Sequence, residues 1–238
     1  MTNKGMIMLE MEPKLLYEYD DGNFNTLVFG FNCNSKIELP EGHTHFGLVI
    51  EGRAALVYGD RIRYLHGGDF FSVIGPAKII SKGVGAISSA YAGFNVCGGP
   101  IEEVGKLRYI NGCTYTLLVP PVRKGDPCLN HLHFPAHSTQ TPHTNPSVRV
   151  NVVYHGSGVC LVPEDEKQKV SLVSGYVFVI KTDTLHSFNT EGESMDVITF
   201  HPDSDVGMTD DDYPMVNRTI VDGVSARFIP QIRTGGVE

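Results

Sequence analysis

Short hydrophobic runs separated by turn residues follow one another along the chain. LVFGFN, FGLVIEG, FFSVI, TYTLLVP, VRVNVVYHG and YVFVI are rich in Val, Ile, Phe and Tyr and are bounded by Gly, Pro, Asn or Asp. Such runs of about four to eight residues are typical of β-strands, and no long stretch keeps the period of an amphipathic helix. The pattern predicts an all-β protein, whose turns the 26 glycines and 14 prolines supply.

The strand pattern occurs twice. Residues 45–79 and 149–186 share a plan: a strand ending in Gly, a polar strand, a hairpin, a second Gly and an apolar strand. We therefore expect two copies of one β-module, joined by a segment with a Gly-Gly-Pro break and a Pro-Pro turn. The predicted organisation is an N-terminal module over 1–95, a connector over 96–127, a C-terminal module over 128–205 and an extension over 206–238.

Charge and composition make some classes of binding partner unexpected. The net charge is −8, and the 19 Lys and Arg residues form no basic stripe, so neither nucleic acid nor an anionic membrane is an expected partner. No apolar run approaches the roughly 20 residues of a membrane span, and the N-terminus lacks a signal-peptide core, so we expect a cytoplasmic protein. The five cysteines have no paired spacing, which predicts free thiols. The five aspartates between Asp203 and Asp212 are expected to form a solvated loop.

Most residues that could bind a metal or act in catalysis lie in the C-terminal module, because seven of the ten histidines lie between 131 and 201. Strand alternation places His131 and His133 on one face of their strand. The same alternation aligns His143, Asn145 and Arg149, if the strand is regular across the intervening proline. His186 follows an apolar strand and a polar turn.

These residues give the sequence a resemblance to the cupin superfamily. Its first motif is Gly, five residues, His-x-His, three or four residues, Glu, six residues, Gly, and here His143 matches the first histidine and Gly156 the final glycine. Gly175 and His186 match the second motif. The resemblance implies two double-stranded β-helix (jelly-roll) barrels in tandem, in which a divalent transition metal such as Fe, Mn, Ni or Zn is bound inside a barrel by three His and a Glu.

The chain departs from this ligand set at two positions. Asn145 stands where the second histidine is expected, and it is a weak neutral donor. Arg149 stands at the glutamate position, and a guanidinium cannot bind a metal. We expect His143 and His186 to be the first metal ligands. The remaining ligands would come from His133, His137 or Asn145, with His201 as a further donor.

Several residues have simpler interpretations. His131 and His133 are as well explained as buried, hydrogen-bonded strand residues. His155 is expected in a surface turn and His201 at a strand end. Arg149 has an alternative partner in Asp196 or Glu193.

The N-terminal module keeps less of the motif. His43 and His45 are shifted from the expected His-x-His positions, and Ile79 stands where the second motif would place a histidine. We expect this module to be structural or to bind substrate. A weak metal site formed by His43, His45 and Glu51 is the alternative.

Three functions remain open. The leading one is a metal-dependent oxygenase or isomerase, in which His143 and His186 hold the metal and Arg149 orients a small anionic substrate. A metal-independent isomerase or epimerase would use His143 or His186 to move a proton. A ligand-binding or sensor protein would only enclose a small molecule. The resemblance also suggests a homodimer, formed through edge strands or exchanged N-terminal strands.

Overall fold

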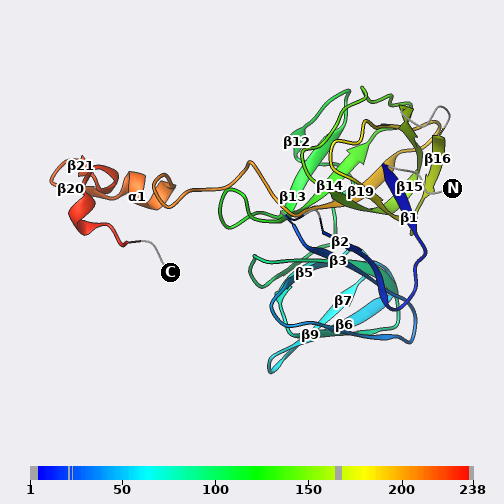
Figure 1. The fold of residues 1–238 in the computed structure, drawn as a ribbon, viewed down its shortest axis with the longest axis horizontal. Helices are drawn as coiled ribbons and strands as arrows, with labels where there is room; N and C mark the ends of the chain where they lie inside the picture. Colours follow the sequence, from blue (N-terminus) through cyan, green and yellow to red (C-terminus); the bar gives the residue numbers. More distant parts are fainter. Residues whose placement is uncertain (1–4, 21, 23, 164–167, 236–238) are drawn as a thin grey trace.

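The computed structural model describes residues 5–20, 22, 24–163 and 168–235. It consists of two β-barrels followed by a small C-terminal arm (Figure 1). The predicted all-β class and the tandem barrels are confirmed. The described residues include no helix of the length and hydropathy that a membrane span requires. All five cysteines are free, and Cys113, Cys128 and Cys160 are buried.

The N-terminal barrel is built from two facing antiparallel sheets. Six strands run in the order β11, β8, β5, β10, β3, β2, and four in the order β4, β9, β6, β7. Their bounds are β2 (Leu15–Tyr19), β3 (Thr26–Phe31), β4 (Lys36–Leu39), β5 (Thr44–Glu51), β6 (Arg53–Tyr58), β7 (Arg61–His66), β8 (Phe70–Ile74), β9 (Ala77–Ser81), β10 (Val84–Ala90) and β11 (Val96–Gly98).

The C-terminal barrel has nine strands. The main order is β1, β17, β15, β19, β14, β13, β12, and β16 and β18 pair with the far half of the long strand β15. Their bounds are β1 (Met6–Leu9), β12 (Leu107–Arg108), β13 (Thr114–Val119), β14 (Cys128–Phe134), β15 (Arg149–Val162), β16 (Gln168–Val173), β17 (Val177–Ile180), β18 (Ser187–Asn189) and β19 (Met195–His201).

The barrel boundaries differ from those predicted. Strand β1 pairs with β17, so the N-terminal strand belongs to the C-terminal barrel. Strand β11 pairs with β8 of the first barrel, whereas β13 pairs with β14 of the second. The segment 96–127 is therefore divided between both barrels, because its short strands complete sheet edges that would otherwise be open.

The repeat is visible in glycines at equivalent positions, where Gly52 follows β5 and Gly68 follows β7, and where Gly156 lies within the long strand β15 and Gly175 follows β16. Gly52 and Gly156 both have left-handed backbones, with φ of 78° and 71°, and Gly68 and Gly175 have φ of 89° and 92°. A Cβ on Gly156 would lie 1.8 Å from the carbonyl oxygen of Ser194. Only glycine fits this turn without moving the backbone.

The interior of the first barrel is filled by large apolar side chains. Phe31, Leu56, Phe71 and Ile79 are fully buried within one hydrophobic cluster. Each such side chain stabilises the fold by about 1.5–3 kcal/mol relative to exposure. The interior of the N-terminal barrel is therefore a packed hydrophobic core.

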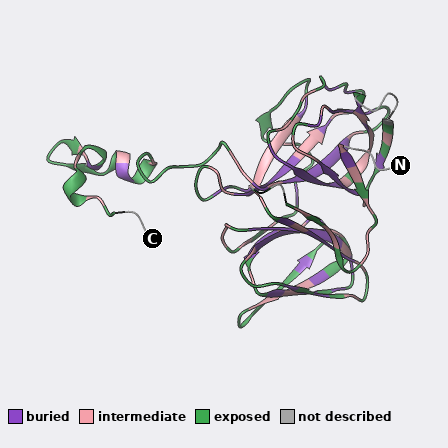
Figure 2. Cartoon of the chain, viewed as in Figure 1, coloured by how far each residue is buried: buried purple, intermediate pink, exposed green. Residues whose placement is uncertain are grey.

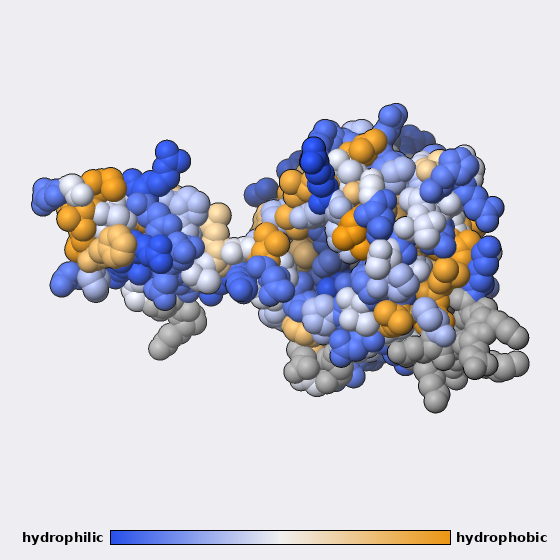
Figure 3. Space-filling view, turned by 90° about the horizontal axis from the view of Figure 1, so that it is seen from above, coloured by the Kyte–Doolittle hydropathy of each residue, from blue (hydrophilic) through white to orange (hydrophobic). Residues whose placement is uncertain are grey.

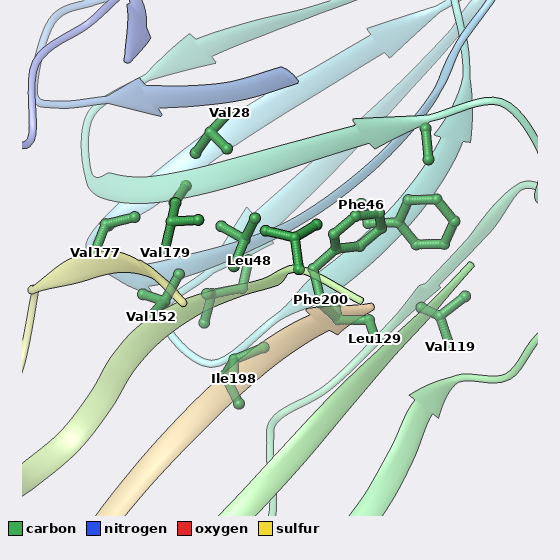
Figure 4. Packing of buried hydrophobic residues seen from close by; sticks show 14 of the residues in the cluster. Val28, Phe46, Leu48, Val119, Leu129, Val152, Val177, Val179, Ile198 and Phe200 are labelled. Atoms are coloured by element: carbon green, nitrogen blue, oxygen red, sulfur yellow. The ribbon is translucent and has the colours of Figure 1, made fainter. Parts of the chain in front are cut away.

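A second cluster joins the two barrels. Phe46 and Leu48 of β5 pack against Ile198 and Phe200 of β19, and the rings of Phe46 and Phe200 lie 5.2 Å apart (Figure 4). The strands that meet here are buried along most of their length (Figure 2). The barrels are therefore held together by a continuous hydrophobic core.

The small C-terminal arm, which corresponds to the predicted extension, stands apart from the barrels at the end of a narrow neck (Figures 1 and 3). It contains helix α1 (Pro214–Arg218), the hairpin of β20 (Ile220–Val221) and β21 (Val224–Ser225), and the 3₁₀ turns η2 (Ala226–Phe228) and η3 (Pro230–Ile232). The predicted acidic loop is thus only the neck of a small folded arm.

Candidate functional site

The C-terminal barrel encloses a cavity of about 310 Å³. Strand alternation turns Asn130, Leu132 and Phe134 of β14 toward it, and Arg149 and Asn151 of β15 line it as well. The polypeptide at 203–206, where the neck begins, forms part of its wall. The cavity is therefore shaped by both the barrel and the start of the C-terminal arm.

His143 and His186 lie side by side in the cavity wall. Their backbones form an antiparallel bridge, with N–H to O distances of 2.9 and 3.0 Å, and their ring centroids are 4.6 Å apart. His143 Nδ1 lies 3.0 Å from the carbonyl oxygen of Thr141, and His186 Nδ1 lies 2.9 Å from that of Thr184. Because a carbonyl can only accept, both Nδ1 atoms carry the proton, and each Nε2 keeps its lone pair.

The environment of His186 keeps its ring neutral. Burial lowers the pKa of His186 to about 4, against the effect of its hydrogen bond to Thr184, and nearby His143 and Arg149 lower it further. The amide Nδ2 of Asn145 lies 3.4 Å from His186 Nε2 and donates toward it. The Nε2 lone pair of His186 therefore faces a donor amide.

Arg149 places a buried cation in the same cavity. The residue is 9 % exposed, and its Nη1 donates to the carbonyl oxygens of Ser147 and Val148 at 3.1 Å and to Ser147 Oγ. Its Nε has no hydrogen-bond partner among the described residues. Burial lowers the pKa of Arg149, and Asp203 opposes this effect, so the guanidinium stays charged near neutral pH.

The acidic neighbour of Arg149 is Asp203, at the start of the neck. Its Oδ1 lies 3.6 Å from Arg149 Nη1 and accepts a hydrogen bond from Ser147 Oγ. The expected partners Asp196 and Glu193 were wrong, because Asp196 binds histidines on the outer face of the sheet and Glu193 binds Ser157. Asp203 is 28 % exposed and offsets the Arg149 charge only in part.

The other predicted metal ligands lie elsewhere. His131 and His133 share a face, as predicted, but it is the face opposite the cavity, where both donate to Asp196 Oδ1 at 2.8 Å. His155 is 72 % exposed and lies 3.6 Å from the other oxygen of Asp196. His137 is exposed in a turn with φ of 63° and does not line the cavity.

Further residues line the cavity; of these, His201 was expected as an additional donor, whereas Thr199, Cys128, Tyr109 and Tyr115 were not predicted as site residues. His201 lines the cavity with Thr199, two positions before it on β19, and burial holds the pKa of His201 well below its usual range. Burial also raises the pKa of the Cys128 thiol. Strand alternation along β19 could have identified Thr199 from His201. Alternation along β13 could also have identified Tyr115, which lines the cavity with Leu117, whereas Tyr109 lies in an irregular segment that gives no such signal.

The donor set does not fit a firmly held metal. His143 and His186 offer two imidazole nitrogens and Asn145 a weak amide, whereas catalytic metal sites use about three strong protein ligands. The described residues contain no group of three His, Cys, Asp or Glu side chains arranged to hold a metal ion. The guanidinium of Arg149 also opposes a cation nearby.

In the N-terminal barrel, too, the described residues form no group that could hold a metal ion. His45 is buried, with Nδ1 2.5 Å from Ser89 Oγ and Nε2 2.9 Å from the carbonyl oxygen of Pro40. Burial lowers the pKa of His45 to about 4. Since both ring nitrogens are engaged and Glu51 is exposed, the weak metal site at His43, His45 and Glu51 is not supported.

Comparisons with known proteins agree on the fold. No family model and no curated protein matches the sequence. A glyoxylate-induced protein from Pseudomonas aeruginosa is similar over 88 % of this chain and 92 % of its own, with a TM-score of 0.63 and 13 % identity. Salicylate 1,2-dioxygenase from Pseudoaminobacter salicylatoxidans, solved with gentisate, is similar over 76 % of this chain and 68 % of its own, with a TM-score of 0.57 and 12 % identity. A cupin 2 conserved barrel domain protein from Leptotrichia buccalis is similar over 84 % of this chain and 91 % of its own, with a TM-score of 0.55 and 15 % identity.

Proposed function

The chain has the fold of the cupin superfamily, in two tandem barrels, and from this premise we propose that its C-terminal barrel binds a small organic anion through Arg149. In this proposal the N-terminal barrel supports the C-terminal barrel structurally and does not take part in binding. The first candidate is a metal-independent protein that binds this anion and, where the bound molecule has a suitable proton, catalyses its isomerisation.

One observation carries the proposal. The guanidinium of Arg149 is buried in the cavity wall, and its Nε has no partner among the described residues. A buried donor without a partner costs about 1–3 kcal/mol. A carboxylate or similar anion would supply that partner and form a charge-assisted hydrogen bond.

The rest of the cavity selects a small ligand with an apolar body. Its volume of about 310 Å³ is at the lower end of small-molecule sites. Much of its wall is aromatic or aliphatic, so an apolar group would replace water there. The apolar and aromatic residues in the wall include Tyr109, Tyr115, Leu117, Leu132, Phe134, Ile180 and Phe188.

The paired histidines supply the chemistry available to such a ligand. The Nε2 atoms of His143 and His186 accept hydrogen bonds or a proton, because both Nδ1 atoms are occupied by carbonyls. With a pKa of about 4, His186 is a weak base near neutral pH. An anion bound at Arg149 would offset the positive charge that lowers this pKa, and so would make His186 a better base when the ligand is present.

Metal-dependent oxygenase activity is the second candidate. It is favoured by the tautomers of His143 and His186, whose Nδ1–H groups donate to backbone carbonyls as those of metal-bound histidines do. A dioxygenase that binds gentisate also shares the fold. A divalent Fe, Mn, Ni or Zn ion would then depend on His143 and His186, with Asn145 and ligand oxygens completing its coordination.

Metal analysis separates the two candidates. We expect protein purified without chelator or affinity tag to hold less than about a tenth of an equivalent of any transition metal. About one equivalent, retained by the native chain and lost in His186→Ala, would overturn the first candidate in favour of the second.

A thermal-shift panel tests the anion site. Acetate, pyruvate, succinate and benzoate are compared with acetamide and benzamide, which have similar shapes but no charge. We expect at least one carboxylate to raise Tm in a concentration-dependent way, because ligands that bind the folded state stabilise it. Equal shifts with the neutral amides, or no shift with any carboxylate, would contradict an anion site.

A further inference from the structure

The C-terminal arm, residues 206–235, exposes most of its hydrophobic side chains. Val216 and Ala226 are the buried hydrophobic residues in it, at 8 % and 5 % exposure, whereas Met215 and Phe228 are 77 % and 71 % exposed. Figure 3 shows apolar side chains gathered on the arm surface. So small a core cannot offset the entropy of ordering the arm. Other exposed apolar residues of the arm are Val206, Met208, Ile220, Val221, Val224 and Ile232.

The neck holds the arm away from its own barrels. The N–H groups of Gly125 and Lys124 donate to the carbonyl oxygens of Ser204 and Met208 at 2.7 and 2.9 Å. Arg123 Nη2 lies 3.5 Å from Asp210 Oδ1. These contacts fix the chain up to about residue 210 against one loop of the C-terminal barrel, so the arm projects outward (Figure 1).

The arm is folded onto itself by polar contacts. Arg227 Nη1 lies 3.2 Å from Asp212 Oδ1, and Arg233 Nη1 lies 3.2 Å from Asp211 Oδ1. Ser225 Oγ donates to the carbonyl oxygen of Asn217 at 2.9 Å. These largely exposed polar contacts shape the arm but leave its apolar side chains unburied, so burial against another surface would supply the stability that its own core lacks.

A groove lined by apolar and basic side chains lies on the outer wall of the N-terminal barrel. It has a volume of about 280 Å³ and is lined by apolar Ala55, Tyr64 and Ile80 and by basic Arg53 and Lys82. Tyr64 and Ile80 are 78 % and 49 % exposed. The groove lies on the β4, β9, β6, β7 sheet, opposite the sheet that packs on the C-terminal barrel.

We propose that two copies of this chain exchange their C-terminal arms, each arm docking its apolar side chains into the groove on the N-terminal barrel of the other copy. The arm projects away from the β4, β9, β6, β7 sheet of its own chain (Figure 1), and the neck contacts hold it there. A second copy offers the same groove without this restriction. Reciprocal exchange places two equivalent contacts about a two-fold axis and closes the assembly as a dimer.

Charge complementarity favours this occupant. The strands that carry the groove also bear Arg61, Arg63 and Lys78, so the sheet is basic although the whole chain has a net charge of −8. The arm bears four aspartates against three arginines and is therefore slightly negative. The side chains of Asp210 and Asp211, although ion-paired with Arg123 and Arg233, are 66 % and 90 % exposed at its surface. Opposite charges at the rim of an apolar contact favour the pairing and its orientation.

The test is the mass of the full chain in solution, measured by light scattering during size-exclusion chromatography. We expect the native chain to be a dimer that dissociates on dilution. In Met215→Asp/Phe228→Asp and in Tyr64→Asp/Ile80→Asp, the dimer should dissociate at protein concentrations about ten- to a hundredfold higher than in the native chain. Ile74→Asp/Val104→Asp is the control, because these residues are 52 % and 51 % exposed and lie outside the arm and the groove. Circular dichroism checks that every variant is folded.

A mixing experiment identifies the contact itself. In a background without the exposed Cys33 and Cys97, one chain carries Ile80→Cys and another carries Met215→Cys. We expect mild oxidation of the mixture to give a disulfide-linked heterodimer, and each chain alone to give much less. A monomeric native chain, a dimer unaffected by the arm variants, or a monomer whose arm instead holds a different protein would overturn the proposal.

Discussion

The backbones of His143 and His186 hydrogen-bond to each other in both directions, so two segments 43 positions apart in sequence fix one pair of imidazoles. Each ring is oriented further by a carbonyl two residues before it. The pair therefore does not depend on a metal for its geometry. It forms one wall of a cavity in which Arg149 is the buried cation.

Stability should fall in mild acid because of buried neutral histidines. His45 and His186 have pKa values of about 4 in the folded chain, against 6.5 for an ordinary histidine. The unfolded chain therefore takes up these protons first as the pH falls. The contribution is complete above pH 6.5 and is lost between 6.5 and 4, on the order of 3 kcal/mol for each residue. Urea unfolding at pH 7.5, 6.5, 5.5 and 4.5 measures it.

The variant His45→Gln serves as the comparison. It should be less stable than the native chain at pH 7.5, and its free energy of unfolding should decline less steeply toward pH 4.5. A native chain whose free energy of unfolding is constant from pH 7 to pH 4.5 would be inconsistent with these buried rings.

Asp196 should contribute to stability, since it accepts hydrogen bonds from His131 and His133 on the outer face of the sheet. Asp196 and His131 are 6 % and 1 % exposed, so water cannot replace these bonds. We expect Asp196→Asn to lower the free energy of unfolding by about 2–3 kcal/mol, measured by urea denaturation. The control is His155→Ala, which removes an exposed ring and should change it by less than about 0.5 kcal/mol. Equal effects of the two changes would disprove this role.

Gly156 and Gly175 allow a matched comparison of backbone strain and crowding. Both have left-handed φ, but a Cβ would be 1.8 Å from Ser194 O at Gly156 and would meet open space at Gly175. We expect Gly175→Ala to cost about 1–2 kcal/mol from backbone conformation alone. Gly156→Ala should cost clearly more or prevent folding. Thermal unfolding of both variants measures the difference, and equal Tm values would argue against a steric requirement at Gly156.

Asp203 should compete with an anion for Arg149. Its carboxylate lies 3.6 Å from the guanidinium and also binds Ser147 Oγ. In Asp203→Asn the local charge becomes more positive while the hydrogen bond to Ser147 is retained, so carboxylates should bind several-fold more tightly. Calorimetric titration measures this, with Asp60→Asn as the control because that side chain is 99 % exposed. Weaker binding in Asp203→Asn would mean that Asp203 assists the ligand.

Sequence periodicity predicts the fold well because alternation and turn glycines are local signals. It also predicts that His131 and His133 share a face. It cannot say which face is inside, because both faces of β14 are largely buried, one by the cavity and one by the neighbouring barrel and Asp196. The sequence therefore allows His133 and His137 as additional metal ligands, but in the structure neither residue lines the cavity.

Contacts between residues far apart in sequence explain the remaining differences between the predicted and the observed structure. Asp203 reaches Arg149 from the start of the neck, and β1 joins β17 across the whole chain. Neither contact has a pattern in the local sequence. Arg149 lines the cavity with His143 and Asn145 as predicted, but β15 begins only at Arg149 and residues 144–148 form no strand, so regular alternation across Pro146 is not what brings these residues together.

The most direct test of the anion site is calorimetric titration of the native chain, Arg149→Lys and Arg149→Leu with the carboxylate that gives the largest thermal shift. We predict that Arg149→Leu, checked for folding by circular dichroism, weakens binding at least about tenfold, because a hydrogen bond to a charged group is worth roughly 1.5–3 kcal/mol. Arg149→Lys should retain part of the affinity, and Arg61→Leu, on the surface, should retain all of it. Native affinity in Arg149→Leu would contradict the assignment of Arg149 as the anion-binding residue.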